Sequence, residues 1–210
     1  MKNFIITKTS LDITQYISNN MVGNTFHHHF HILYDLRSNI DKEVVNYVEI
    51  GAYCGASSCL MLNHPNPVNV TSIDIGTFTP GGVDTIYHNV EKFKLNHNKF
   101  ELIVGDSHSS ETLNTLKSKV SEIDILYIDG EHSYPSVMQD FNDYKDLVVS
   151  GGYIVFDDYL DTNLQVKPAV DDIIPLLNGE FEIIGCVENT FKARPSDWEH
   201  NNDFILKKYK

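Results

Sequence analysis

Positive charge is scarce in this sequence. It contains 16 lysine and arginine residues against 29 aspartate and glutamate residues, which gives a formal net charge of -13 and a pI near 5.0. Because phosphate groups are bound mainly through lysine and arginine, this balance argues against nucleic acid or an anionic membrane as a partner. A small-molecule or neutral partner fits this composition better. The composition does not decide between a monomer and a homo-oligomer.

Cysteine and long apolar runs are also scarce. The three cysteines, Cys54, Cys59 and Cys186, lack the dense spacing of a disulfide framework, which favours a reducing compartment. Cys54 and Cys59 have no second Cys/His pair nearby, which argues against zinc. No stretch approaches 18 apolar residues, and the first residues lack the apolar core of a signal peptide. We therefore expect a cytoplasmic protein without a membrane span.

Short apolar runs alternate with helix-length segments along the 210 residues. The apolar runs span residues 44–50, 69–74, 100–106, 123–129, 152–158, 181–187 and 203–209. The segments between them span residues 56–63, 83–96, 108–118, 134–148 and 166–177. This alternation predicts an α/β fold in which helices cover both faces of a parallel sheet. The polar link from 188 to 202 shows no helical period, so we expect a hairpin loop there and an antiparallel final strand.

Residues 1–41 precede the first expected strand and are predicted to form an N-terminal helical cap of one or two helices, with residues 42–210 as the main domain. The cap contains the segment FHHHFHILYDLR. In a helix, His27 and His31 share a face that could bind a metal, or that could be a polar flank or a wall over a substrate.

A glycine-containing segment, EIGAYCGASS, follows the first expected strand from Glu49 to Ser58. Gly51 and Gly55 allow the backbone to approach a ligand, and the helix that follows offers unpaired N–H groups. A nucleotide or an amino-acid carboxylate could bind there, although a tight strand-to-helix turn would explain the segment equally well. The spacing is not the G-x-G-x-x-G of a dinucleotide site, which disfavours NAD.

Polar residues end the next two expected strands. Asp74 could accept hydrogen bonds from both hydroxyls of a ribose, and Asp106 with Ser107 suits the edge of an adenine. Each residue could instead cap a helix, a position that Asp and Ser favour. Their repetition at successive strand ends favours a ligand, because ligands of open α/β sheets bind outside those ends.

Over roughly residues 44–210, the chain resembles a class I S-adenosylmethionine-dependent methyltransferase. Four features carry the resemblance: the E-x-G-x-x-x-G segment, the acid that ends the second strand, G-D-S at the end of the third, and the antiparallel final strand. The resemblance implies a Rossmann-like, doubly wound, seven-stranded sheet of order 3-2-1-4-5-7-6. It also implies that S-adenosylmethionine is bound by the following residues: Glu49, Gly51, Ala52, Gly55, Ser57, Asp74, Asp106, Ser107 and Asp129.

Two acidic segments close the following strands: Asp129-Gly-Glu-His132, and Asp157-Asp158 after YIVF. Three carboxylates at adjacent strand ends would repel one another unless a cation joined them, and an oxygen-only set suits Mg²⁺, or another divalent cation such as Mn²⁺. The segments are similar to metal-dependent sugar O-methyltransferases of the mycinamicin and tylosin (TylF-like) type. This similarity implies that Asp129, Asp157 and Asp158 bind the metal, with His132 as general base and Asp129 beside it in catalysis.

Simpler roles exist for the same residues. Asp157-Asp158 could cap a turn, and His132 could cap or pack beside Tyr134. Tyr134 and Tyr159 could line an acceptor pocket or only pack. Acceptor contacts are also expected from HHHFH and from the 188–202 loop, which contains Phe191, Arg194 and Trp198; Trp198 could stack on a sugar or anchor its loop.

The sequence therefore predicts a Mg²⁺-dependent O-methyltransferase that acts on a sugar hydroxyl of a glycan, glycoside or nucleotide-sugar. A catechol or caffeoyl-CoA type enzyme is a rival, although that group usually has Asp-Asn where this chain has Asp157-Asp158. A cephalosporin-hydroxylase-like enzyme and a non-catalytic S-adenosylmethionine-binding module are two further candidates. The intact set of Asp129, His132, Asp157 and Asp158 argues against the binding module.

Overall fold

Seven strands form a single sheet in the computed structural model, which describes residues 7–23, 30–187 and 202–209. The strand order is β3-β2-β1-β4-β5-β7-β6, which confirms the predicted fold class and order. β1 to β5 pair in parallel, whereas β7 runs antiparallel to both β5 and β6, as expected for the final strand. The strands are β1 (Val45–Ile50), β2 (Val68–Asp74), β3 (Lys99–Val104), β4 (Ile123–Ile128), β5 (Val148–Phe156), β6 (Phe181–Val187) and β7 (Asp203–Lys208).

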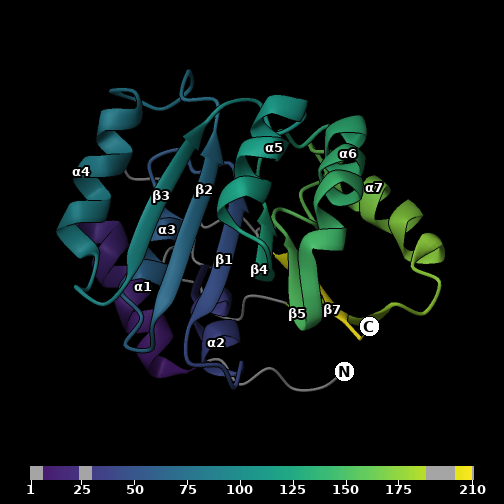
Figure 1. Ribbon diagram of the computed structural model, residues 1–210, viewed down its shortest axis with the longest axis horizontal. Helices are drawn as coiled ribbons and strands as arrows, with labels where there is room; N and C mark the ends of the chain where they lie inside the picture. The colour runs from purple at the N-terminus through teal and green to yellow at the C-terminus, as the bar shows by residue number, and fades with distance from the viewer. Residues whose placement is uncertain (1–6, 24–29, 188–201, 210) are drawn as a thin grey trace.

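Helices cover both faces of the sheet. In Figure 1, α5 and α6 lie in front of it, and α1, α2 and α3 lie behind it. The α-helices are α1 (Lys8–Asn20), α2 (His31–Ser38), α3 (Ala56–Leu62), α4 (Val83–Phe93), α5 (Ser110–Lys119), α6 (Tyr134–Tyr144) and α7 (Val166–Ile173), and 3₁₀ turns extend the last two over Lys145–Leu147 and Ile174–Leu176. None of the helices in the described ranges is long and apolar enough to cross a membrane.

The alternation of side chains along each strand divides the core into two layers. In β1, Tyr47 packs into the layer that contains α1 to α4, whereas Val48 and Ile50 pack into the layer that contains α5 to α7. Ile17 of α1 and Leu33 of α2 are buried in the first layer. The two N-terminal helices predicted from the sequence are therefore part of the core of the sheet.

One helix ends earlier, and one strand begins earlier, than the sequence pattern suggests. α4 ends at Phe93, and the backbone N–H of Leu95 instead donates to the carbonyl of Leu62, 3.0 Å away. α6 and its 3₁₀ turn extend to Leu147, close to the predicted end, but β5 already begins at Val148, which pairs with Ile123 of β4. In both places a contact with a distant segment sets the boundary.

Candidate functional site

Backbone hydrogen bonds continue past the ends of the central strands. The N–H of Gly51 donates to Ile73 (2.8 Å), that of Asp129 donates to Ile50 (2.9 Å), and that of Asp157 donates to Ile128 (3.1 Å). These bonds fix the first residues after β1, β4 and β5 in register with the neighbouring strands. The acids expected at the sheet edge are therefore held by backbone that cannot move independently of the sheet.

Gly51 is required by the approach of two strand ends. Its φ is +91°, and a Cβ at this position would lie 1.9 Å from the carbonyl oxygen of Asp129. No L-amino acid with a side chain fits there without separating β1 from β4. The sequence predicts close approach of a ligand at this glycine, whereas the structure shows close approach of the protein's own backbone.

A pocket of about 1050 Å³ opens at this edge of the sheet, at the upper end of the range typical of small-molecule sites. β1 lies between β2 and β4, so the pocket sits where the chain order reverses, which is where open α/β sheets bind ligands. Predicted cofactor residues that line the pocket are Gly51, Ala52, Ser57, Asp74, Asp106, Ser107 and Asp129.

Asp74 supports the glycine segment. Its Oδ2 accepts hydrogen bonds from the backbone N–H groups of Ala52 (2.9 Å) and Tyr53 (2.7 Å), and its Oδ1 accepts from Gly76 (2.6 Å). A carboxylate has about four lone-pair sites, so capacity for one further donor remains. Asp74 fixes the pocket wall and keeps room for one further donor, whereas the sequence prediction has it accept from both hydroxyls of a ribose.

Glu49 lies behind the pocket wall, with 0% of its surface exposed. Its carboxylate accepts hydrogen bonds from the hydroxyls of Tyr47 (2.8 Å), Ser57 (2.6 Å), Ser72 (2.7 Å) and Ser58. Burial raises the pKa of Glu49, and these hydroxyls act in the opposite direction. The structure does not provide the expected contact between Glu49 and a cofactor; the residue joins β1, β2 and α3.

Gly55 is likewise outside the pocket lining. It precedes α3 with a φ of +81°, a left-handed conformation that glycine adopts without strain. Its role in the structure is therefore to turn the chain into α3.

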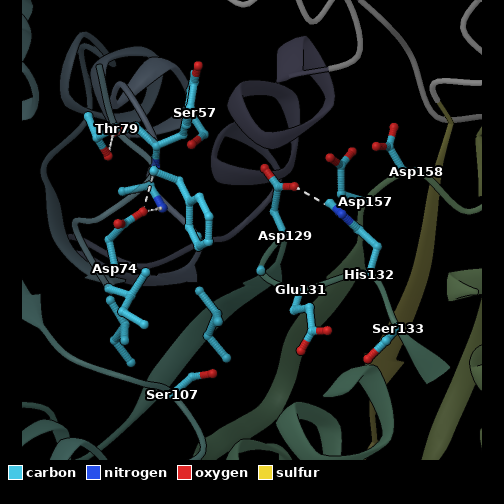
Figure 2. A pocket seen from close by; sticks show the side chains of 18 of the residues that line it. Ser57, Asp74, Thr79, Ser107, Asp129, Glu131, His132, Ser133, Asp157 and Asp158 are labelled. Atoms are coloured by element: carbon cyan, nitrogen blue, oxygen red, sulfur yellow. Dashed lines mark hydrogen bonds and ion pairs between the residues drawn. The ribbon is translucent and has the colours of Figure 1, made fainter. Parts of the chain in front are cut away.

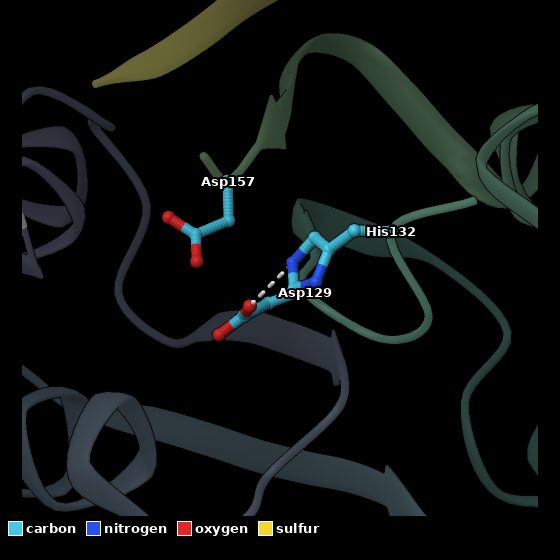
Figure 3. A group of neighbouring side chains, drawn as sticks. All are labelled: Asp129, His132 and Asp157. Atoms are coloured by element: carbon cyan, nitrogen blue, oxygen red, sulfur yellow. Dashed lines mark ion pairs between the residues drawn. The ribbon is translucent and has the colours of Figure 1, made fainter. Parts of the chain in front are cut away.

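Asp129, His132 and Asp157 come together from the ends of β4 and β5. Each of these side chains offers a ligand atom, and the three atoms lie within 4.8 Å of one another. Figure 3 shows the imidazole directed at Asp129, with Nε2 3.3 Å from Oδ1, and the Asp157 carboxylate on the same side. Asp157 is only 1% exposed. This group would be an unfavourable accumulation of negative charge without a cation or a proton.

The acids around Asp129 perturb its ionisation. Burial, followed by the neighbouring charges of Asp157 and Asp158, raises the pKa of the Asp129 carboxyl well above its usual range. Perturbed carboxyls in a pocket are typical of functional sites.

Asp158 lines the pocket but is not one of the three gathered groups. Its backbone has a φ of +51°, and Figure 2 shows its carboxylate beyond that of Asp157 as seen from Asp129. The structure thus brings His132 into the place in the cluster that the sequence predicts for Asp158.

Gln165 is a pocket residue that no prediction from the sequence includes. Its backbone N–H donates to the carbonyl of His132 (3.0 Å), and its side-chain Oε1 accepts from the N–H of Tyr134 (3.1 Å). It also lines the pocket. The segment after β5 therefore holds the backbone on both sides of Ser133, and no local sequence pattern would have indicated this.

The pocket rim carries exposed apolar side chains. Phe78, which is 80% exposed, and Ile75 lie between β2 and α4 and line the pocket with Tyr53. Expected acceptor contacts at His27, Phe191, Arg194 and Trp198 lie outside the described residues.

Comparison with known proteins places this geometry in a family. Residues 48–159 match the model of a methyltransferase domain. An uncharacterized protein of Acanthamoeba polyphaga mimivirus is 38% identical over 205 residues, which cover 92% of each chain.

Solved structures share the fold at low identity. The O-methyltransferase TomG of Streptomyces achromogenes, involved in tomaymycin synthesis and solved with S-adenosylmethionine, has a TM-score of 0.63 at 13% identity and covers 97% of this chain and 91% of its own. An rRNA methylase of Streptococcus thermophilus also has a TM-score of 0.63 at 13% identity, with 86% and 96% covered. Because the sequence identity is this low, their likeness shows the fold alone. Together, the matched domain, the strand order and the pocket at the strand ends show that this chain belongs to the class I S-adenosylmethionine-dependent methyltransferases.

Proposed function

We propose that this protein transfers a methyl group from S-adenosylmethionine to a sugar hydroxyl, with a divalent cation held at the ends of β4 and β5. The observation that carries the proposal is the grouping of Asp129, His132 and Asp157 at one end of the cofactor pocket. A binding module would not require a histidine beside buried carboxylates.

The carboxylates fit a divalent cation of the Mg²⁺ or Mn²⁺ type. Asp129 and Asp157 are close enough to share an ion, whose charge would offset the burial and the repulsion that raise the pKa of Asp129. Asp158 on the pocket rim would bind the same ion or its water molecules. When bound, S-adenosylmethionine supplies an electrophilic methyl group, and the cation lowers the pKa of a coordinated hydroxyl.

His132 acts as the general base in this proposal. Its Nε2 faces Asp129, so an imidazolium formed by proton uptake would be stabilised by a neighbouring carboxylate. The hydrogen bond from Gln165 to the carbonyl of His132 restrains the backbone that carries the ring. The residues therefore bind the acceptor, remove its proton and store that proton next to a negative charge.

A sugar acceptor is supported by the polar groups at one end of the pocket. Asp129, His132 and Asp158 lie there and suit the hydroxyls of an acceptor, whereas Tyr53, Ile75 and Phe78 lie toward Asp74, where the cofactor is expected. His132 distinguishes the site from the catechol type, in line with the sequence prediction. The proposed acceptor is thus a glycan, glycoside or nucleotide-sugar with adjacent hydroxyls.

Calorimetry tests the cofactor and metal parts of the proposal. S-adenosylhomocysteine is titrated into wild type, Asp157→Asn and His132→Ala, each with and without Mg²⁺ or Mn²⁺. We expect all three proteins to bind S-adenosylhomocysteine, and Asp157→Asn to lose cation binding. His132→Ala should retain cation binding if the histidine is a base, whereas loss of cation binding would identify it as a ligand.

Sugar acceptors are then screened by release of S-adenosylhomocysteine, with oxygen uptake recorded in parallel. Methylated product without oxygen uptake supports the proposal. Oxygen uptake with hydroxylated product would contradict it in favour of a hydroxylase. Absence of S-adenosylhomocysteine binding under every condition would contradict the methyl-transfer function altogether.

A further inference from the structure

A second histidine and carboxylate pair borders the pocket. His108 lies between β3 and α5 and lines the pocket beside Ser107, which Figure 2 shows well separated from Asp157. The Nε2 atom of His108 is 3.2 Å from Oδ1 of Asp140 on α6, and its Nδ1 atom is 3.6 Å from Oδ1 of Asp106. The imidazole thus joins an exposed acid on the pocket rim to an acid on a helix.

α6 holds the 105–108 loop at three points. The hydroxyl of Tyr144 donates to the carbonyl of Ser107 (2.7 Å), the side chain of Gln139 donates to the carbonyl of His108 (3.4 Å), and Asp140 pairs with the His108 ring. Within the loop, the N–H of His108 donates to Oδ1 of Asp106 (2.9 Å). The loop geometry therefore depends on α6.

Asp140 is 1% exposed, which is unusual for a carboxylate. Burial raises its pKa to about 6, while Ser107 and His108 act in the opposite direction. Burying this charge carries a cost in stability, and its interacting groups all lie along the 105–108 loop and α6. Because burying Asp140 costs stability, its role is better explained by the groups that it positions than by the stability that it adds.

Asp106 is the group so positioned. A carboxylate accepts hydrogen bonds but does not donate them, so it favours the exocyclic amine of adenine over the carbonyl that hypoxanthine has at the same place. Without a partner, an exposed aspartate samples several rotamers. With His108 on one side and its own loop backbone on the other, its carboxylate is restrained.

We propose that His108 and Asp140 are positioning residues that hold Asp106 for recognition of the adenine amine, and so determine how strongly the pocket prefers an adenine to a hypoxanthine base. This inference rests on the proposed S-adenosylmethionine-dependent function. It assigns a task to a pair that takes no part in methyl transfer itself, and it predicts a change in base preference rather than a general loss of binding.

The experiment compares the affinities for S-adenosylhomocysteine and S-inosylhomocysteine by calorimetry. The variants are His108→Ala, His108→Gln and Asp140→Asn, with His88→Ala on the exposed surface of α4 and Asp146→Asn in the 3₁₀ turn after α6 as matched controls. Wild type and controls should bind the adenine compound roughly 10-fold or more tightly than the inosine compound, the size expected for one hydrogen bond to a charged group. His108→Ala and Asp140→Asn should reduce this ratio to about 2-fold.

His108→Gln should recover part of the preference, because its amide can reach Asp140 from a similar position. A wild-type ratio near one, or full preference in both His108→Ala and Asp140→Asn, would overturn the inference while leaving the proposed function intact. Failure of wild type to bind either compound would overturn the proposed function, and the inference with it. If His108→Ala does not fold, Asp140→Asn, which keeps the shape of the side chain, gives the answer.

Discussion

Glu49, which is fully buried, and Asp129, which is partly buried, lie near the ends of the neighbouring strands β1 and β4, yet their surroundings differ in kind. Four hydroxyl groups donate to the Glu49 carboxylate. Asp129 instead has His132 beside it and is surrounded by the charges of Asp157, Asp158 and Glu49. The hydroxyl donors account for the Glu49 carboxylate within the fold, whereas the further acids around Asp129 disfavour its ionised form unless a proton or a cation is bound. The surroundings of a buried acid therefore separate structural support from chemistry without reference to any relative.

The largest effect that tests this contrast is expected at His132. His132→Ala should lower the rate of methyl transfer to an accepted sugar by about 10² to 10⁴-fold, because general-base catalysis contributes about that much. Binding of S-adenosylhomocysteine should persist, as measured by calorimetry. His88→Ala is the control. A rate close to wild type would remove His132 from its proposed role.

Replacement of Glu49 should act on folding. Glu49→Gln should lower the free energy of unfolding by about 3 to 5 kcal/mol, because the amide NH2 replaces one carboxylate oxygen and leaves two buried hydroxyl donors without their acceptor, at about 1 to 3 kcal/mol each. Urea denaturation of this variant, compared with the exposed Glu43→Gln, measures the effect. Asp129→Asn should have the opposite sign in protein free of metal, since it removes a carboxylate whose ionisation is disfavoured. Changes in the free energy of unfolding that have the same sign and size in Glu49→Gln and Asp129→Asn would contradict the contrast between the two acids.

Asp140 is an intermediate case, with a single imidazole as its ionic partner among the described residues. Its pKa of about 6 lies above that of an aspartate in an unfolded chain, so the folded protein binds the extra proton between roughly pH 4 and 6. Its contribution to stability is therefore most favourable at low pH and declines as pH rises through 6. Asp140→Asn should stabilise the protein at pH 7.5 by up to about 3 kcal/mol and flatten this slope in thermal melts from pH 5 to 8. A less stable Asp140→Asn protein at pH 7.5 would show a purely structural role.

The smallest effect is expected from the cation itself. Mg²⁺ or Mn²⁺ at 100 times its dissociation constant should stabilise wild type by about 2.7 kcal/mol, visible as a rise in melting temperature. Asp157→Asn should show no such rise, and Glu43→Gln should show the wild-type rise. A similar rise in Asp157→Asn would place the cation elsewhere.

The fold was predictable because hydrophobic runs and turns carry local information. The existence and order of the seven strands and the antiparallel β7 were confirmed, although β5 begins at Val148, before the predicted run of 152–158. Helix ends were less predictable, since the end of α4 depends on a bond between Leu95 and Leu62, which lie on different elements. Such contacts leave no trace in a local pattern.

The site was predictable only in part, for a related reason. Asp74 and Asp129 follow strands, and their place at the sheet edge follows from parallel pairing. The same pattern does not distinguish Glu49 from these two pocket residues. Its side chain turns inward, to hydroxyls contributed by three elements. Nor could the pattern reveal Gln165, which lines the pocket from the segment after β5, or Asp140, which contacts the pocket residue His108 from α6.

The exposed side of the pocket rim near His132 is free to change during evolution. Asp129 and Asp157 directly follow strands, and backbone pairing with the sheet fixes them, whereas Glu131 and Asn163, which also line the pocket, stand on connecting segments. Substitutions on those segments leave the core intact, because loops tolerate change that strands do not. Under the proposed function, a lineage carrying this chain can acquire new acceptors by drift at the rim, while one inherited reaction persists beneath it.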